Sequence, residues 1–274
     1  MKKLQIIIIS LFLLTTAAFS ALFLYNRLMV DHTAPIIISD GVPLEVNATA
    51  TDKELCAGLR ATDNVDGDIT DKIIVRRVSQ LLSANSAQVT YTVFDSASNY
   101  CTFSRPVYYT DYRKPRFALS QPLLYNVGDT VTLLDRLTAA DVIDGDISTK
   151  IRLALINLSV NVEGDYQIRV QVTNSSGDTS ILSLTVMIRN LTARHPVLQL
   201  SQYLVYAEGK ETPEDYRSLI TNVLDSEGGT PVDPKDVVIS GEIDHSHPGS
   251  YDVRFSYTNS TGLESSVILT VVVE

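Results

Sequence analysis

The stretch that decides the fold is Asp63-Asn64-Val65-Asp66-Gly67-Asp68-Ile69, which returns 78 residues later as Asp141-Val142-Ile143-Asp144-Gly145-Asp146-Ile147. About 25 residues past each copy lies a strand-like run that ends in a polar turn, and the chain holds a third such run; the three are Tyr91–Asn99, Val170–Asp178 and Phe255–Leu263. A fixed period of this size is typical of an array of like modules. A chain of 274 residues therefore reads as three modules of about 80 residues each.

The composition and the apolar pattern indicate an all-β body. Val, Ile, Thr and Tyr are abundant, and 45% of the residues are hydrophobic. Residues Tyr166–Val172 and Tyr251–Tyr257 alternate apolar and polar side chains, which predicts strands with one buried face and one exposed face. Further strands are expected at Lys72–Val78, Gln88–Phe94, Thr102–Tyr109 and Val267–Val273.

Prolines and turn residues place the module boundaries. Pro35, Pro115 and Pro196 precede apolar runs, and proline suits the start of an edge strand because it cannot donate to a ladder. We expect modules at 31–112, 113–192 and 193–274, the third being divergent and acidic. The pairs Gly164-Asp165 and Gly249-Ser250 are expected to be turns. Short alternating strands with such turns predict three tandem immunoglobulin-like (Ig-like) β-sandwiches.

Residues 1–30 predict a membrane anchor. Lys2 and Lys3 precede a nearly unbroken apolar run from Leu4 to Tyr25. About 20 apolar residues suffice to cross the hydrocarbon core as a helix, and basic residues before it favour a cytoplasmic N-terminus. The alternative is a signal peptide cleaved after Ala18-Phe19-Ser20, but the apolar run continues past that site. We therefore expect a single-pass protein of the cell membrane with its C-terminus outside the cell.

The two cysteines of the chain, Cys56 and Cys101, both lie in the first module. An even pair in one small extracytoplasmic domain favours a disulfide, and two free thiols are the alternative.

The order of these motifs resembles a known family. A proline at the first strand, Asp-x-x-Asp-Gly-Asp-Ile, and a Tyr-rich strand closed by Asp-Ser-Ala-x-Asn resemble the bacterial Ig-like domain of the pesticidal-crystal-protein type, common in bacterial surface proteins. The first module carries both halves, with Ser98 where the family has glycine. The second keeps Asp141–Ile147, and the third lacks Asp-Gly-Asp. The resemblance implies an extracellular β-sandwich for display, spacing or adhesion, without a catalytic activity common to the family.

The repeated aspartates have two interpretations. Asp63, Asp66 and Asp68, and likewise Asp141, Asp144 and Asp146, are candidate Ca²⁺ ligands, because a hard cation takes six to eight oxygens. The second interpretation, which we favour, is a turn in which the carboxylates accept from backbone amides and glycine takes a positive φ.

Charge limits the choice of partner. Residues 195–274 hold 4 basic and 13 acidic residues, a net charge of −9. Nucleic acid as a partner is therefore disfavoured, because its recognition needs basic patches. No catalytic motif with a recognisable mechanism is present, so we expect no enzyme.

Three functions remain open, each with its own structural expectation. A protein or glycan recognition module predicts exposed aromatic residues on the third module, with Tyr203, Tyr206 and Tyr216 as candidates. A spacer, or a structural subunit of an envelope assembly, predicts rigid contacts between modules. A hydrolase requires a pocket with convergent carboxylates.

Overall fold

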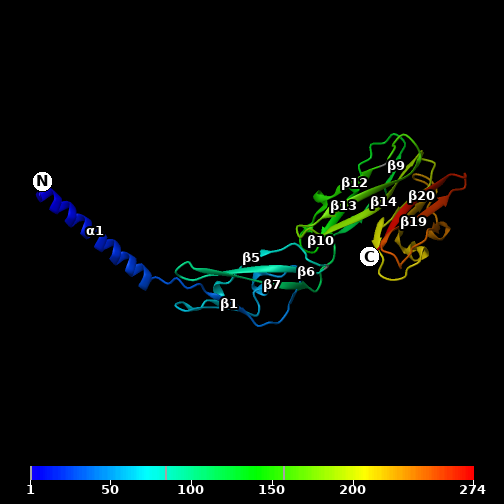
Figure 1. Cartoon of the computed structure of the whole chain (residues 1–274). Coiled ribbons are helices and arrows are strands. Elements are labelled where there is room, and N and C mark those ends of the chain that lie inside the picture. The colour runs from blue at the N-terminus through cyan, green and yellow to red at the C-terminus, as the bar shows by residue number, and fades with distance from the viewer. Residues whose placement is uncertain (1, 84, 157) are drawn as a thin grey trace. The chain divides into compact units, whose positions relative to one another are not determined.

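The computed structural model describes residues 2–83, 85–156 and 158–274, and it divides the chain into two compact units, Met1–Asp111 and Tyr112–Glu274. Helix α1 (Lys2–Met29) begins the first unit, and strands make up most of the remainder (Figure 1). The all-β, multi-domain fold predicted behind an apolar N-terminal helix is confirmed.

Unit 1 contains one two-sheet sandwich. The smaller sheet has the order β1-β3-β4, built from β1 (Ile36–Ser39), β3 (Leu59–Asp63) and β4 (Gly67–Asp68). The larger sheet has the order β2-β7-β6-β5, built from β2 (Leu44–Val46), β7 (Tyr100–Tyr109), β6 (Ser86–Phe94) and β5 (Ile74–Val78). The short helices are α2 (Asp52–Leu55) and η1 (Thr70–Lys72). The inward faces of the two sheets bury an apolar core of Ala61, Ile69, Val89, Tyr91, Val93 and Val107.

Unit 2 holds two further sandwiches of this plan, and the smaller sheet of the second has two strands instead of three. In its first sandwich a sheet of order β11-β10-β8 packs against a sheet of order β12-β13-β14-β9. The strands are β8 (Arg116–Leu119), β9 (Leu124–Asn126), β10 (Leu137–Asp141), β11 (Gly145–Asp146), β12 (Arg152–Ile156), β13 (Gly164–Thr173) and β14 (Thr179–Arg189). The short 3-10 helices are η2 (Leu134–Arg136) and η3 (Ser148–Lys150). In its second sandwich a sheet of order β15-β17 packs against a sheet of order β16-β20-β19-β18. The strands are β15 (Val197–Leu200), β16 (Leu204–Tyr206), β17 (Ile220–Leu224), β18 (Val238–Ser240), β19 (Gly249–Thr258) and β20 (Glu264–Val273). The short 3-10 helices are η4 (Pro213–Leu219) and η5 (Pro234–Asp236).

The three sandwiches share one topology, and the prolines stand where edge strands begin. In each sandwich the second strand pairs in parallel with the last one, as Leu44 does with Val107 on β7. Each smaller sheet has an edge strand that begins directly after a proline, as predicted; the prolines are Pro35, Pro115 and Pro196.

The predicted strands form, but the hairpins are longer than the alternation suggested. Gly164 and Gly249, expected in turns, instead begin β13 and β19, where they pair with Ile188 and Val273. The turn prediction was wrong here because the neighbouring strand supplies ladder partners for these backbones, and pairing extends the strand beyond the alternating residues.

One hydrophobic core runs through both sandwiches of unit 2. The buried cluster extends from Phe117 and Leu119 on β8 to Leu269 and Val271 on β20 without a break. Strand β14 of the first sandwich contacts β19 of the second, and the two lie next to each other in Figure 1. These two modules therefore pack as one body, in contrast to separate modules joined only by a linker.

Candidate functional site

The Asp-x-x-Asp-Gly-Asp loops are turns stabilised by their own carboxylates. Asp63 Oδ1 accepts hydrogen bonds from the amides of Val65 at 2.9 Å and Asp66 at 3.0 Å. These bonds, that of Asp66 first, lower the pKa of Asp63. Gly67 has a φ of 72°, the left-handed conformation that glycine adopts without strain. The second loop repeats the arrangement, with Asp141 accepting at the same distances and a φ of 69° at its glycine.

The middle aspartate of each loop accepts hydrogen bonds from a turn that lies far along the sequence. Asp66 accepts from the Ser96 amide at 2.6 Å and from the Ser96 hydroxyl at 2.7 Å. Asp144 does the same with Ser175, and Lys150 Nζ lies 2.7 Å from its carboxylate. Burial acts to raise the pKa of Asp144, but the bonds from Lys150 and Ser175 lower it overall. The two halves of the repeated motif are therefore one hydrogen-bonded structure.

The third aspartate of each loop has a separate task. Asp68 accepts from the Thr70 amide and Asp146 from the Ser148 amide, both at 2.9 Å, at the start of a short 3-10 helix. The structure does not bring the three aspartates of either loop together as one set of metal ligands within residues 2–83, 85–156 and 158–274. It gives them the turn and capping partners of the favoured interpretation.

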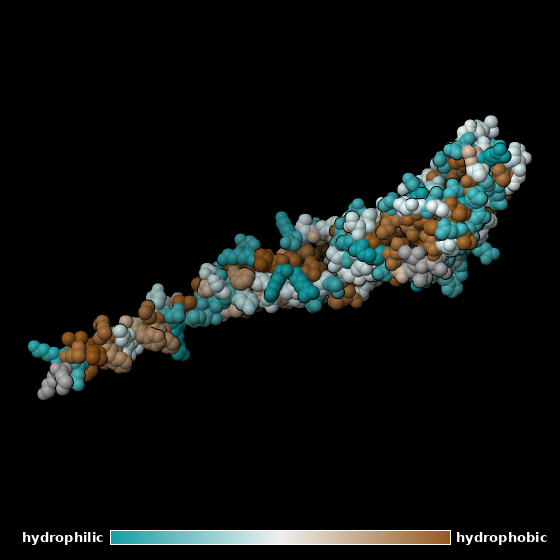
Figure 2. Space-filling view, turned by 90° about the horizontal axis from the view of Figure 1, so that it is seen from above, coloured by the Kyte–Doolittle hydropathy of each residue, from teal (hydrophilic) through white to brown (hydrophobic). Residues whose placement is uncertain are grey.

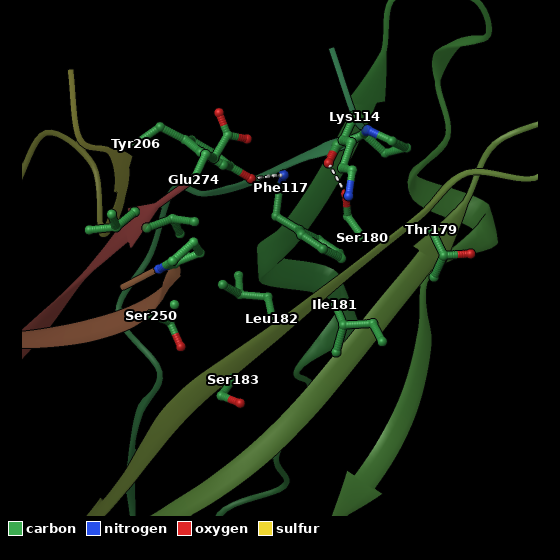
Figure 3. Close-up of a pocket in the computed structure, with 15 residues that line it drawn as sticks. Lys114, Phe117, Thr179, Ser180, Ile181, Leu182, Ser183, Tyr206, Ser250 and Glu274 are labelled. Atoms are coloured by element: carbon green, nitrogen blue, oxygen red, sulfur yellow. Dashed lines mark hydrogen bonds between the residues drawn. The ribbon is translucent and has the colours of Figure 1, made fainter. Parts of the chain in front are cut away.

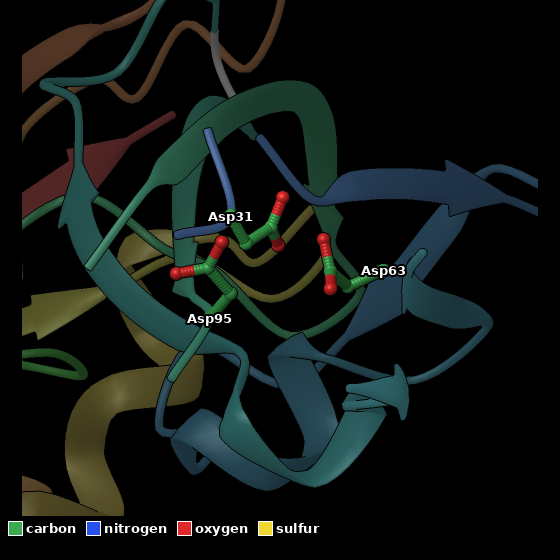
Figure 4. Close-up of side chains that lie close together, drawn as sticks. All are labelled: Asp31, Asp63 and Asp95. Atoms are coloured by element: carbon green, nitrogen blue, oxygen red, sulfur yellow. The ribbon is translucent and has the colours of Figure 1, made fainter. Parts of the chain in front are cut away.

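One member of the predicted set, Asp63, instead joins two aspartates that the motif does not contain. The carboxylates of Asp31, Asp63 and Asp95 converge, and one oxygen of each lies within 4.8 Å of the others (Figure 4). Asp31 lies between α1 and β1, Asp63 ends β3, and Asp95 follows β6. Sequence reasoning missed Asp31 and Asp95, although one signal was available. Asp95 occupies the turn position at which the other two modules have Asn174 and Asn259.

The predicted disulfide is not formed, and Cys56 and Cys101 are free thiols. Cys56 caps the end of α2 and lies beside Arg105, whose guanidinium bonds the carbonyls of Leu55 and Ala57. Cys101 lies on β7, an element separate from α2, and burial raises the pKa of each of the two thiols.

Two of the tyrosines proposed for recognition join the modules of unit 2. Tyr203 is 3% exposed, and its amide donates to the Leu119 carbonyl at 2.9 Å. The Tyr206 hydroxyl accepts from the Phe117 amide at 2.8 Å, and the Arg116 guanidinium lies 4.4 Å from the centre of its ring. These residues of the third module thus have partners in the second.

Tyr216, the third candidate, lies outside that contact. It is half-buried on η4, and burial, with Glu211 and Asp215 nearby, raises its pKa to about 12. It therefore does not add to an exposed aromatic patch.

A polar cluster supports the same contact between modules. Asp165 on β13 lies 2.6 Å from Arg254 on β19 and also pairs with Arg189. Burial acts to raise the pKa of Asp165, but the two guanidinium groups lower it overall. Beside them Thr185 donates to the carboxylate of Asp252, whose pKa is raised chiefly by burial.

A cleft of about 370 Å³ opens where the two sandwiches of unit 2 meet (Figure 3). Phe117, Ser180, Leu182 and Tyr206 line it, and Glu274 is the one carboxylate among its described lining residues. That carboxylate pairs with Arg116. The cleft therefore lacks the two convergent carboxylates that a glycosidase-like hydrolase requires.

Comparison with known proteins finds a distant relative by sequence. No family model matches the chain. It is 25% identical over 247 residues to the pesticidal crystal protein Cry22Aa of Bacillus thuringiensis, which covers 88% of this chain and 33% of that protein. The chain thus spans about a third of the length of this relative.

Solved structures give only distant matches. A structure of the second CBM51 module in complex with GlcNAc and INT domains from Clostridium perfringens ZmpB is 16% identical, covers 53% of this chain and 29% of that one, and has a TM-score of 0.28. Protocadherin gammaB7 EC3-6 is 12% identical, covers 88% of this chain and 74% of that one, and has a TM-score of 0.19. Similarity at this level carries no argument about what the chain binds.

Proposed function

We propose that this chain is a membrane-anchored surface protein whose Ig-like sandwiches act as a spacer or scaffold in adhesion or recognition outside the cell. The observation that carries the proposal is the exposed apolar surface of helix α1. Residues Lys3–Arg27 are long and apolar enough to span a bilayer, and their side chains are not buried by the rest of the molecule. Exposed apolar residues such as Phe12 and Phe19 lie on the helix surface, and Figure 2 shows the apolar character of this segment. A helix with such an uncovered surface needs a lipid environment.

The contacts of unit 2 favour a scaffold over a recognition surface made of tyrosines. Tyr203 and Tyr206 are the most conspicuous aromatic candidates of the third module, and both are engaged by the second module. A continuous core and a set of ion pairs at one contact resist bending between the two sandwiches. This rigidity is what a spacer or a structural subunit of an envelope assembly needs, and that subunit role is the alternative function.

We also propose membership of the bacterial Ig-like group and the absence of catalysis. The motifs of the first two modules and the 25% identity to a crystal protein over 88% of the chain support the membership. The cleft between the two sandwiches, with Glu274 as the one carboxylate among its described lining residues, gives no support to a hydrolase at that place. The acidic third module fits a basic protein partner or an uncharged glycan better than nucleic acid.

A topology experiment tests the proposal. The full chain carries a tag after Glu274 and is expressed in a bacterium, and the membrane fraction is washed at alkaline pH. We expect the tag in the washed membranes, open to protease added outside the cytoplasmic membrane, with residues 1–27 retained in the intact mass. Recovery of the chain in the cytoplasm, or a tag that only lysis exposes, would contradict the proposed location.

A matched variant separates anchoring from folding. Replacing Leu11 and Leu14 by Arg puts charge at the centre of α1 and leaves the sandwiches unchanged. We expect this variant to leave the membrane fraction while retaining the thermal transitions of the β modules.

A further inference from the structure

We propose that Asp31, Asp63 and Asp95 bind a single Ca²⁺ ion in the first module. Their carboxylates come from three segments of the chain, and one oxygen of each lies within 4.8 Å of the others (Figure 4). Asp95 is 7% exposed, whereas Asp31 and Asp63 are partly exposed, so the cluster lies between the interior of the module and its surface. This ligand set differs from the Asp-x-x-Asp-Gly-Asp triplets, of which it uses only Asp63.

Two oxygens of the cluster are buried without a hydrogen-bond partner. Asp31 Oδ2 and Asp63 Oδ2 are both covered, and neither has a donor among the described residues. The other oxygen of each is occupied: Asp31 Oδ1 accepts from the Thr33 amide and Asp63 Oδ1 from the turn amides. A covered carboxylate oxygen without a partner is costly unless something positive satisfies it. These two oxygens are therefore free to bind a cation.

The second module shows how the same place is satisfied without a metal. Asn174 stands where the first module has Asp95, and its Nδ2 donates to Asp141 Oδ2 at 3.1 Å and to the Tyr112 hydroxyl at 3.0 Å. The equivalence is firm because Asp144 bonds Ser175 as Asp66 bonds Ser96. In this module an amide donor sits between two acceptors.

The third module uses the same solution. Asn259 Nδ2 donates to the Arg194 carbonyl at 2.9 Å and to the Asp225 carbonyl at 3.0 Å. In the first module the amide of this position is replaced by the carboxylate of Asp95, an acceptor. A donor has thus been exchanged for a carboxylate at this position, which is the change that a cation site requires.

No basic side chain compensates this charge within the described chain. The ion pairs of residues 2–83, 85–156 and 158–274 include Lys72 with Asp66, but none reaches Asp31, Asp63 or Asp95. The Asn99 side-chain amide donates to Asp95 and to the Asp31 carbonyl, but an amide carries no charge. The three carboxylates therefore have no counter-ion among the described side chains. Three carboxylates this close repel one another, and a divalent cation converts that repulsion into attraction.

The donor set selects calcium. All ligands are carboxylate oxygens, and neither histidine nor cysteine is among them. Zinc and copper sites favour histidine and cysteine, so the donor set does not suit these metals. Ca²⁺ accepts mono- and bidentate carboxylates in irregular geometry, whereas Mg²⁺ demands a near-ideal octahedron and retains its water. Three carboxylates from separate segments suit the more tolerant ion.

Binding would fasten the chain where it leaves the helix. Asp31 is two residues past the end of α1, while Asp63 and Asp95 belong to the sandwich itself. The ion therefore ties the exit segment to the first module. If α1 is the membrane anchor of the proposed function, calcium stiffens the protein at its exit from the bilayer, but the site itself does not depend on that function.

Calcium titration of the full chain in detergent micelles tests the site. We expect isothermal titration calorimetry of chelator-treated protein to show one Ca²⁺ per chain. At a free concentration about 100 times Kd, the unfolding transition of unit 1 should rise by about 10 °C or more. Mg²⁺ should give a smaller shift at the same concentration.

The chain supplies its own matched variants. Asp95→Asn installs the amide that the other modules have and should weaken Ca²⁺ binding about 100-fold or more, while unit 1 stays folded without calcium. Asp31→Asn should weaken binding as well. Asp68→Asn changes a carboxylate of the same loop outside the cluster and should leave binding unchanged. Absence of uptake by folded wild-type protein, or equal uptake by Asp95→Asn, would overturn the site.

Discussion

The contact between the two sandwiches of unit 2 permits a sharp prediction at Tyr206. Replacing Tyr206 by Phe keeps the ring under Arg116 but removes the hydroxyl that accepts from the Phe117 amide at 2.8 Å. That amide belongs to a residue that is 3% exposed, so it is left without a partner in a place that water hardly reaches. Loss of one partner of a buried hydrogen bond costs about 1–3 kcal/mol. For a unit of this size, about 2 kcal/mol corresponds to a decrease in Tm of about 4–8 °C.

Tyr203 provides the matched control. Its hydroxyl accepts from the Leu200 amide at 3.0 Å, a bond of the same kind that lies wholly inside the third module. Tyr203→Phe should therefore cost a similar free energy of unfolding. Because the core is continuous, we expect both variants to shift one common transition of unit 2.

The assay is differential scanning calorimetry of the full chain together with hydrogen exchange read by mass spectrometry. Both variants should lower the protection of β8 in the second module and of β16 in the third to the same extent, while the transition of unit 1 serves as an unchanged reference. Separate transitions for the two modules of unit 2, with Tyr203→Phe moving only one of them, would refute the single-body argument. So would an unchanged Tm for Tyr206→Phe.

Three further predictions concern charge and the thiols. Burial raises the pKa of Asp252, so ionisation of this carboxyl destabilises the fold increasingly as the pH rises above the unfolded-state value of about 3.9. Asp252→Asn should therefore raise the Tm of unit 2 at pH 7, and the gain should vanish near pH 3. Asp144→Ala should lower the stability of unit 2 by about 2 kcal/mol in denaturant unfolding. Asp146→Ala should cost less, because Asp146 bonds Ser148 within its own turn. Because the pKa of Asp144 is lowered, its contribution is present above about pH 4 and should be lost as the pH falls below that. Cys56 and Cys101 should both react with a thiol reagent in denaturant without reductant, and a count of zero thiols per chain would restore the disulfide.

Much of the fold is local, and the sequence alone predicts it. Alternation of side chains reports which face of a strand is buried, so β13 and β19 were predictable to within a few residues at each end. The Asp-Gly-Asp turn is equally local, since Asp63 bonds amides two and three residues away. Ser98, where the other modules have glycine, holds a φ of 72° and was visible as a departure from the pattern.

The tertiary structure decided what depends on distant segments. Asp31 and Asp95 lie 32 residues before and after Asp63, and neither belongs to the repeated Asp-x-x-Asp-Gly-Asp motif, so the sequence does not indicate that the three share one centre. The thiols that spacing suggested as a pair lie on separate elements, Cys56 at the end of α2 and Cys101 on β7, and they are free. Tyrosines that resembled a binding surface join two modules instead. A sequence pattern records the direction of a side chain relative to its own strand, whereas partners across a sandwich are set only when the sheets pack against each other.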